Sequence, residues 1–202
     1  MTAARQEALR AILFMFTLSL VLITGVSSLS LLTAKRVARN ANLVLQRAVM
    51  EVTGVLVSSE ADAISAWFSR AVRIEPDDPM RMRVLDPDTG KTHTLVFQRT
   101  VSGLWGKITA VVGVDPATGL FRQIRIIDQN ETPGLGARIT EPWFQNQMAG
   151  KRGPFTLVPE GTRSNQANDL DAITGATVTS TAIRDLLNGI VRDRASRLEA
   201  GK

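Results

Sequence analysis

The stretch DAITGATVTST, residues 171–181, connects a polar segment to the most clearly periodic part of the chain. After this stretch, apolar side chains recur at positions i, i+3, i+4, i+7 and i+8 with polar side chains between them, which predicts an amphipathic helix. Thr179 and Ser180 are both good N-cap residues, so one of them is expected to begin this helix. Its apolar face comprises Ile183, Leu186, Leu187, Ile190 and Val191.

A loop that leads into a helix can bind an anion, because the first four N–H groups lack internal partners and the helix dipole is positive there. Gly175 would let the backbone approach a ligand closely, and four hydroxyls lie nearby in the sequence. The sequence therefore predicts a phosphate-binding turn, with an ordinary N-cap that has spare hydroxyls as the alternative. It is not a P-loop, because the glycine is not followed by Lys and then Ser or Thr. The hydroxyls belong to Thr174, Thr177, Thr179 and Ser180.

Two hairpins are predicted upstream of this loop. The runs KITAVVGV and LFRQIRII flank DPATG, residues 115–119, and two alternating runs within residues 80–98 flank DPDTGK. Asp, Pro and Gly suit tight turns. KITAVVGV is apolar on both faces whereas LFRQIRII alternates, which is typical of a central strand beside a half-exposed one.

The remaining segments are shorter. Helices are expected near residues 41–56 and 61–72, with EPDDP, residues 75–79, ending the helical region. A short helix is expected in TEPWFQNQMAG, and residues 159–170 are polar and turn-rich, as in a surface loop. The sum predicts one α+β domain of antiparallel hairpins with flanking helices.

The N-terminal part of the chain carries a strongly apolar segment. Residues 11–34 are 24 residues without a charge, whereas about 20 helical residues suffice to cross a bilayer. We expect a membrane-spanning helix; a cleaved signal peptide is the alternative, because Arg5 and Arg10 precede the run. The expected division is a tail at 1–10, a transmembrane helix at 11–34, a helical connector at 35–79 and the domain at 80–198.

The positive charge accompanies the membrane segment. The net charge is +5, and residues 1–56 hold six basic and two acidic side chains, so no nucleic-acid partner is expected. The positive-inside rule weakly favours a cytoplasmic location for the part that follows the span. Lys35, Arg36 and Arg39 lie on that side, against Arg5 and Arg10 on the other.

Disulfides and metal ligation are not expected. The chain has no cysteine and one histidine, His93, which lies in a predicted strand without an accompanying carboxylate cluster. We therefore predict no metal site, and a structural or exposed role for His93.

Residues 171–177, DAITGAT, resemble the D-x-x-[ST]-G-A-T flavinylation motif of the FMN-binding domain. This domain occurs in the G subunit of the Rnf complex and in the C subunit of the sodium-pumping NADH:quinone reductase, Nqr. ETPGLGARI, residues 131–139, is similar to a second signature of that family. With GLWG, PWFQNQMAGK and the N-terminal anchor, the resemblance covers roughly residues 10–195.

The resemblance implies that Thr177 carries FMN through a phosphoester bond. A threonine hydroxyl is a poor nucleophile without a base, and His93 is far away in the sequence, so the chain has no evident means of loading itself. The resemblance implies a separate, metal-dependent flavin transferase that uses FAD. This enzyme would recognise Asp171, Thr174, Gly175, Ala176 and Thr177.

A bound flavin ring needs a flat, mostly apolar pocket edged with hydrogen-bonding groups. We expect the glycines of PGLG to let the main chain approach the ring, Leu135 and Trp105 to lie beside it, and Glu131 and Thr132 to meet its polar edge or the ribityl chain. Ordinary core packing is the alternative for Leu135 and Trp105, and a loop cap is the alternative for Glu131. Lys151 is either a phosphate contact or a solvated lysine. The expected cofactor contacts are Trp105, Glu131, Thr132, Gly134, Leu135, Gly136, Thr174, Gly175, Ala176, Thr177, Thr179 and Ser180.

The resemblance implies an electron-carrying subunit of an Rnf-type ferredoxin:NAD oxidoreductase that translocates ions. It implies other redox subunits as partners, no catalytic residue in this chain, and no activity of the chain alone. It also places Met1 in the cytoplasm and the flavin domain outside the inner membrane, against the local charges. The alternatives are the Nqr C subunit, another respiratory chain, and a non-redox tethered module that binds a phosphate ligand.

Overall fold

The computed structural model describes residues 3–55, 60–162, 164 and 166–200. The chain divides into two compact units, residues 1–42 and residues 43–202. The first unit is helical and belongs to α1 (Ala3–Thr53), whose residues 11–32 are exposed although most of them are apolar. In the described part of the chain, the segment Arg5–Thr53 is the single helix long and apolar enough to cross a membrane, with a mean hydropathy of 2.2 in an 18-residue window. The predicted apolar helix is therefore present.

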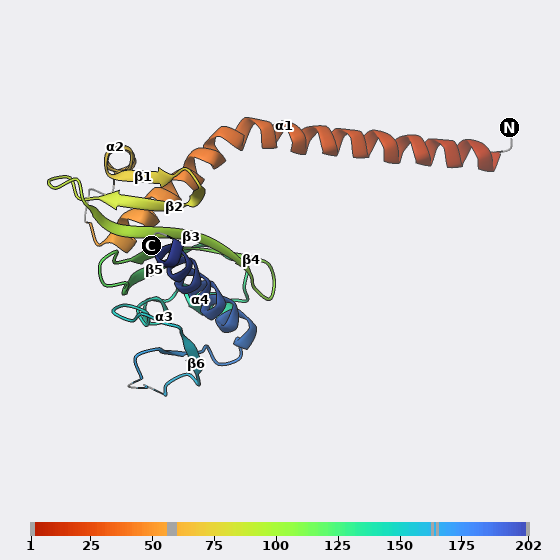
Figure 1. The fold of residues 1–202 in the computed structure, drawn as a ribbon. Helices are drawn as coiled ribbons and strands as arrows, with labels where there is room; N and C mark the ends of the chain where they lie inside the picture. Colours follow the sequence, from red (N-terminus) through yellow and green to blue (C-terminus); the bar gives the residue numbers. More distant parts are fainter. Residues whose placement is uncertain (1–2, 56–59, 163, 165, 201–202) are drawn as a thin grey trace. The chain divides into compact units, whose positions relative to one another are not determined.

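The second unit is built on a five-stranded antiparallel sheet in the order β1-β2-β3-β4-β5 (Figure 1). Both predicted hairpins are confirmed, as β2 with β3 and β4 with β5. Residues 72–79, expected in a helical connector, instead form β1 and the start of β2, because α2 (Ala61–Ala71) ends at Ala71. The strands are β1 (Val72–Glu75), β2 (Asp78–Leu85), β3 (Thr92–Ser102), β4 (Lys107–Val114) and β5 (Phe121–Asp128).

The two hairpin turns use the same chemistry. Asp86 Oδ1 accepts hydrogen bonds from the N–H groups two and three residues later, and Asp115 Oδ1 does the same in the second turn. Gly90 and Gly119 end these turns with φ of +66° and +74°, a conformation that strongly favours glycine. The sequence DPxTG thus sets both turns.

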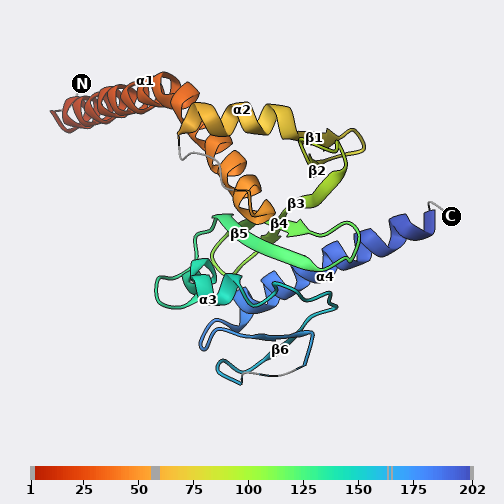
Figure 2. The same cartoon turned by 90° about the vertical axis from the view of Figure 1, so that its left-hand side faces the viewer.

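Strand β4 lies between β3 and β5 and is buried on both faces, as its sequence predicts. Alternate side chains such as Ile108 and Val112 join one hydrophobic cluster, and Val111 joins the other. Val111 packs in the cluster that contains the last turns of α1 and residues of α2, which cover one face of the sheet (Figure 2). Gly113 lies close under α1, since a Cβ there would be 2.5 Å from the carbonyl oxygen of Val52.

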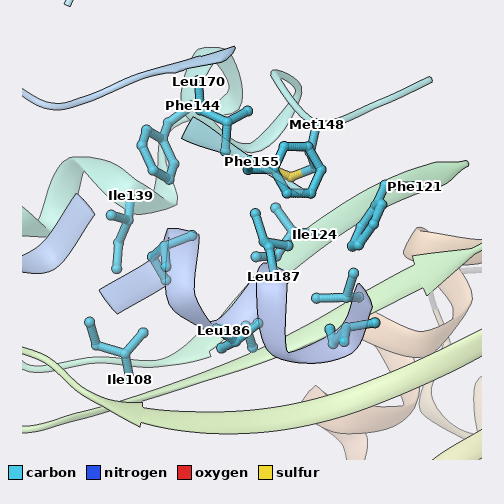
Figure 3. Packing of buried hydrophobic residues seen from close by; sticks show 14 of the residues in the cluster. Ile108, Phe121, Ile124, Ile139, Phe144, Met148, Phe155, Leu170, Leu186 and Leu187 are labelled. Atoms are coloured by element: carbon cyan, nitrogen blue, oxygen red, sulfur yellow. The ribbon is translucent and has the colours of Figure 1, made fainter. Parts of the chain in front are cut away.

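The larger core lies between the other face of the sheet and α4 (Thr177–Ala200), as Figure 3 shows. Leu187 of α4 lies next to Ile124 of β5 in Figure 3, and the Phe121 ring meets Phe155 edge-on with centroids 5.0 Å apart. The predicted apolar face of the last helix is confirmed. The core is closed by η1 (Gly136–Thr140), α3 (Pro142–Gln145) and the parallel pair β6 (Thr156–Val158) and β7 (Asp169–Asp171).

Candidate functional site

Helix α4 begins two or three residues earlier than the sequence indicates. Thr177 is its first residue, and the amide of Ser180 already donates a helical hydrogen bond to Ala176 O over 2.9 Å. The predicted N-caps, Thr179 and Ser180, therefore lie inside the first turn. Their side chains are buried and bond to other segments, so neither caps the helix.

The hydroxyls of the threonine loop do not converge, contrary to expectation. The Thr179 hydroxyl donates to Glu131 Oε2 over 2.5 Å, and Ser180 Oγ accepts from the amide of Ile173 over 2.9 Å. The Thr174 amide donates to Glu160 Oε2 over 2.7 Å. Thr177 is exposed, and its hydroxyl has no hydrogen-bond partner among the described residues. The Thr177 hydroxyl is thus accessible, whereas the hydroxyls of Thr179 and Ser180 are buried and bonded.

Glu131 is the buried centre of the site, with 5% of its surface exposed. Besides the bond from Thr179, its Oε1 accepts from the amide of Trp105 over 3.0 Å. A Cβ at Gly136 would lie 2.7 Å from both Glu131 Oε2 and Thr179 Oγ1, and a Cβ at Gly103 would overlap Glu131 Oε1. Both carboxylate oxygens therefore bind protein groups, and Glu131 links three segments of the site instead of presenting a free edge.

The PGLG loop packs against the threonine loop. Thr132 O accepts from the amides of Leu135 and Ala137, each over 3.1 Å, and Gly134 turns the chain with φ of +75°. Gly175 has φ of +77°, and a Cβ there would lie 3.0 Å from Leu135 Cδ2. Two glycines thus bring the Leu135 side chain next to the loop that carries Thr177.

Large apolar side chains in these segments are exposed. Trp105 is 68% exposed, Leu104 58%, Val178 52% and Leu135 42%. The interpretation of Trp105 and Leu135 as core residues is therefore wrong. Grouped exposure of this kind usually marks a ligand or partner surface. Leu104 and Val178 were missed, although each adjoins a residue that the motifs single out.

Two residues of the motif region have internal roles. Asp171 Oδ2 accepts from the amide of Gly161 over 2.8 Å, and its own amide donates to Gln147 Oε1 over 2.6 Å. Lys151 Nζ donates to Asp169 O over 2.5 Å, so its ammonium is bound to strand β7. Asp171 is thereby held at the end of β7. Neither interpretation of Lys151 describes its observed contact.

An ion pair that the sequence did not indicate supports the threonine loop. Arg138 forms hydrogen bonds of 3.1 and 2.7 Å with the two oxygens of Glu160, and Glu160 Oε2 accepts from the Thr174 amide over 2.7 Å. The Arg138 guanidinium and then the Thr174 amide lower the pKa of Glu160 to about 2. Arg138 also lies 5.2 Å from the centre of the Trp143 ring. This pair fixes the start of the TGAT turn.

The sole histidine lies away from this group of residues. His93 Nδ1 is 2.9 Å from Thr94 Oγ1, and its carbonyl oxygen accepts from Arg122 over 3.2 Å. Within the described ranges, no three His, Cys, Asp or Glu side chains are grouped as metal ligands would be.

The chain resembles known proteins over most of its length. Residues 103–192 match the family model of the FMN-binding domain. The C subunit of the Na⁺-translocating NADH-quinone reductase of Neisseria meningitidis is 27% identical over 160 residues, which are 69% of this chain and 62% of that protein. The G subunit of the Na⁺-translocating ferredoxin:NAD⁺ oxidoreductase complex of Acetobacterium woodii is 37% identical over 111 residues, 52% of this chain and 53% of that protein.

The chain thus matches between about half and three fifths of the length of these relatives. Among solved structures, Shewanella oneidensis NqrC superposes with a TM-score of 0.61 at 20% identity, covering 71% of this chain and 88% of that one. This likeness confirms the α+β fold.

Proposed function

We propose that this chain, whose residues 103–192 match the family model of the FMN-binding domain, is a membrane-anchored, electron-carrying subunit of an Rnf-type complex, with FMN esterified to Thr177. The similarity to subunits of two ion-translocating oxidoreductases supports the class of complex. Nqr is the alternative, since its C subunit matches a longer part of the chain at lower identity.

The exposed, unpartnered hydroxyl of Thr177 carries the proposal. The hydroxyls of Thr179 and Ser180 are buried and engaged by Glu131 and the Ile173 amide. A transferase that docks on this surface therefore meets the Thr177 hydroxyl unbonded. The hydroxyls of Thr179 and Ser180 cannot compete for the flavin without breaking buried bonds that hold the first turn of α4.

The first turn of α4 suits a phosphodiester. The first helical hydrogen bond is donated by Ser180, so the amides of Thr177, Val178 and Thr179 lack partners inside the helix. These donors and the positive end of the helix dipole stabilise the one negative charge that the diester retains.

Exposed apolar side chains on the segments that are bonded to or packed against the start of α4 suit a flavin ring. Trp105 offers an exposed flat ring, and its amide is bonded to Glu131. Leu135 offers an exposed branched side chain, which lies next to Gly175 in the loop before α4. We assign them the role of flanking the ring and excluding water from it, together with Leu104 and Val178. When bound, FMN supplies electron transfer in one-electron steps.

Loading requires a second protein. Thr177 has no base within its hydrogen-bonding reach among the described residues, so the flavin transferase must take its proton. The bond formed joins Thr177 Oγ1 to the FMN phosphorus, and the bond broken in FAD releases AMP. The Asp171 to Thr177 loop, held by Gly161 and Glu160, would be presented to that enzyme as a rigid segment.

In-gel fluorescence tests the attachment. The full chain, co-expressed with a flavin transferase, is denatured, washed and viewed under ultraviolet light. Thr177→Val, which keeps the side-chain shape and removes the hydroxyl, should abolish the band. Thr140→Val removes another exposed threonine hydroxyl and should leave the band unchanged. A band that persists in Thr177→Val refutes the attachment, and a wild-type chain without a band favours the non-redox module.

Two further experiments address the surroundings. Because the chain has no cysteine, Asp88→Cys places one thiol on the exposed β2–β3 turn. On intact cells an impermeant thiol reagent should label it, since we propose that the N-terminus is cytoplasmic and the flavin domain is periplasmic; labelling only after lysis contradicts this. Membranes that lack the chain should lose ferredoxin:NAD oxidoreduction, whereas loss of NADH:quinone reduction instead would assign the chain to Nqr.

A further inference from the structure

A groove of about 560 Å³ lies at the other end of α4 from Thr177. Arg194, which lines it, is 17 residues after Thr177, or roughly 25 Å along the helix axis. Strand β3, the β4–β5 turn, residues 152–153 and α4 form its walls. The groove is therefore separate from the flavin site and has no part in the proposed function.

The β4–β5 turn is shaped around Arg194. Arg194 Nη1 donates to Gly119 O over 2.9 Å, and a Cβ on Gly119 would overlap the guanidinium. The matching glycine of the β2–β3 turn, Gly90, has nothing within 4 Å of a Cβ position. The two turns share the DPxTG sequence, but in one of them the glycine also makes room for an arginine.

Two arginines of the groove lack an ion-pair partner among the described residues. Among the described residues, neither Arg152 nor Arg194 forms an ion pair. The nearby carboxylates are engaged, Asp115 by Arg122 and Asp193 by Arg99. Burial lowers the pKa of Arg194 and the positive charge of Arg152 lowers it further, while the negative charge of Asp115 offsets part of this effect.

The third arginine of the groove is different. Arg81 lies 3.5 Å from Glu75 and 3.6 Å from Asp77, so its charge is balanced, although its Nε has no hydrogen-bond partner in the part of the chain described. The unbalanced charge is thus confined to the side formed by Arg152 and Arg194. An anion between them would relieve their repulsion and form charge-assisted hydrogen bonds.

The rest of the lining is largely apolar and comes from Leu95, Phe97, Pro116, Ala117, Val191 and Ala195. An inorganic anion would leave this apolar surface exposed to water. A neutral apolar molecule would displace water from two guanidinium groups without offering them hydrogen-bond acceptors in its place. The volume falls within the range of small-molecule sites. We propose that the groove binds a small amphipathic anion, in which a carboxylate or phosphate lies between Arg152 and Arg194 and an apolar body contacts Leu95, Phe97 and Val191.

Calorimetric titration with 1-naphthyl phosphate tests this site. The full chain is held in phosphatidylcholine nanodiscs, and empty nanodiscs are subtracted. We expect 1-naphthyl phosphate to bind at least about tenfold more tightly than inorganic phosphate or 1-naphthol, because each of these lacks one half of the recognition. Equal binding of all three probes would overturn the proposal.

Variants assign the binding to the arginines. Arg152→Glu should weaken binding of 1-naphthyl phosphate at least about tenfold, and it is safe for folding because Arg152 is exposed. Arg194→Gln should do the same, with thermal unfolding as a check, since it loses the bond to Gly119. Arg192→Gln, which changes an exposed arginine of the same helix outside the groove, should bind as wild type. An unchanged affinity in Arg152→Glu overturns the proposal.

Changing the lipid composition of the nanodiscs distinguishes a lipid headgroup from a free solute as the source of the anion. Adding phosphatidylglycerol to the nanodiscs should displace 1-naphthyl phosphate if a lipid headgroup supplies the anion, and should have no effect if a free solute does. Flavin fluorescence of Arg152→Glu should equal that of the wild type, so a failure here is distinguishable from a failure of the flavin assignment.

Discussion

The hydroxyl of Thr179 donates to the carboxylate of Glu131 over 2.5 Å, although the two residues are 48 positions apart. The bond is buried and joins the first turn of α4 to the start of the ETPGLG segment. Through its second oxygen, Glu131 also holds the amide of Trp105. The two sequence motifs and the GLWG turn are thereby fixed around the exposed Thr177.

Loss of this carboxylate should destabilise the domain. Hydrogen bonds to charged groups contribute about 1.5–3 kcal/mol each, so we expect Glu131→Gln to lower the free energy of unfolding by roughly that amount. Thr179→Val should also be destabilising. Because the residues share one bond, the double variant should lose less than the sum of the single losses. Chemical unfolding of the three variants measures this, and strictly additive losses would show that the bond is unimportant.

Position 136, which lies beside this hydrogen bond, should tolerate no residue larger than glycine. A Cβ at Gly136 would lie 2.7 Å from both bonded oxygens, so Gly136→Ala should lower stability by roughly 1–3 kcal/mol. Gly189→Ala is the matched control, because in α4 its Cβ would meet nothing closer than 3.9 Å. It should raise stability by up to about 1 kcal/mol through helix propensity. Thermal unfolding compares the two, and a neutral Gly136→Ala would contradict the observed packing.

The support of the threonine loop by Glu160 should fail only in strong acid. Arg138 and the Thr174 amide lower the pKa of Glu160 from its ordinary 4.5 to about 2. A depressed pKa means that the carboxylate stabilises the fold fully above about 4.5, and that this contribution is lost as the pH falls toward 2. NMR titration of the Glu160 carboxyl and the Thr174 amide should show a common midpoint near 2, and Glu160→Gln should remove the amide transition. A midpoint at 4.5 would mean that the pair does not form.

The parts of the fold that sequence could predict are those set by local patterns. The DPxTG turns and the alternation around them predict both hairpins, and the repeat from Ile183 to Val191 predicts the core face of α4. Strand β1 has four residues, and β6 and β7 have three each. Such short segments carry no periodicity, so they were not predicted.

The sequence motifs predict which segments form the site, but they do not predict the contacts between the side chains of those segments. The motifs identify Thr177, Leu135 and Trp105, yet nothing local reveals that Thr179 bonds to Glu131 or that Arg138 pairs with Glu160, 22 residues away. Those bonds depend on the tertiary approach of distant loops. They reverse the expected role of Thr179, whose hydroxyl faces the interior of the protein.

The exposed aromatic and aliphatic residues should report on the flavin and hardly affect folding. Trp105→Ala and Leu135→Ala remove side chains that are 68% and 42% exposed, so stability should change by no more than about 0.5 kcal/mol. In loaded native protein, Trp105→Ala should increase flavin fluorescence, because a tryptophan against the ring quenches it. Met80→Ala, which removes another exposed apolar side chain, is the control. Identical fluorescence in Trp105→Ala and wild type would exclude Trp105 from the ring's surroundings.

The covalent bond at Thr177 is tested most directly by mass spectrometry of the full chain expressed with a flavin transferase. The intact denatured protein should be heavier by one FMN less one water. After trypsin digestion, the increment should lie on the peptide of residues 164–184, and fragmentation should place it on Thr177. An unmodified mass with freely dissociating flavin, or an increment on any other residue of that peptide, would contradict the assignment.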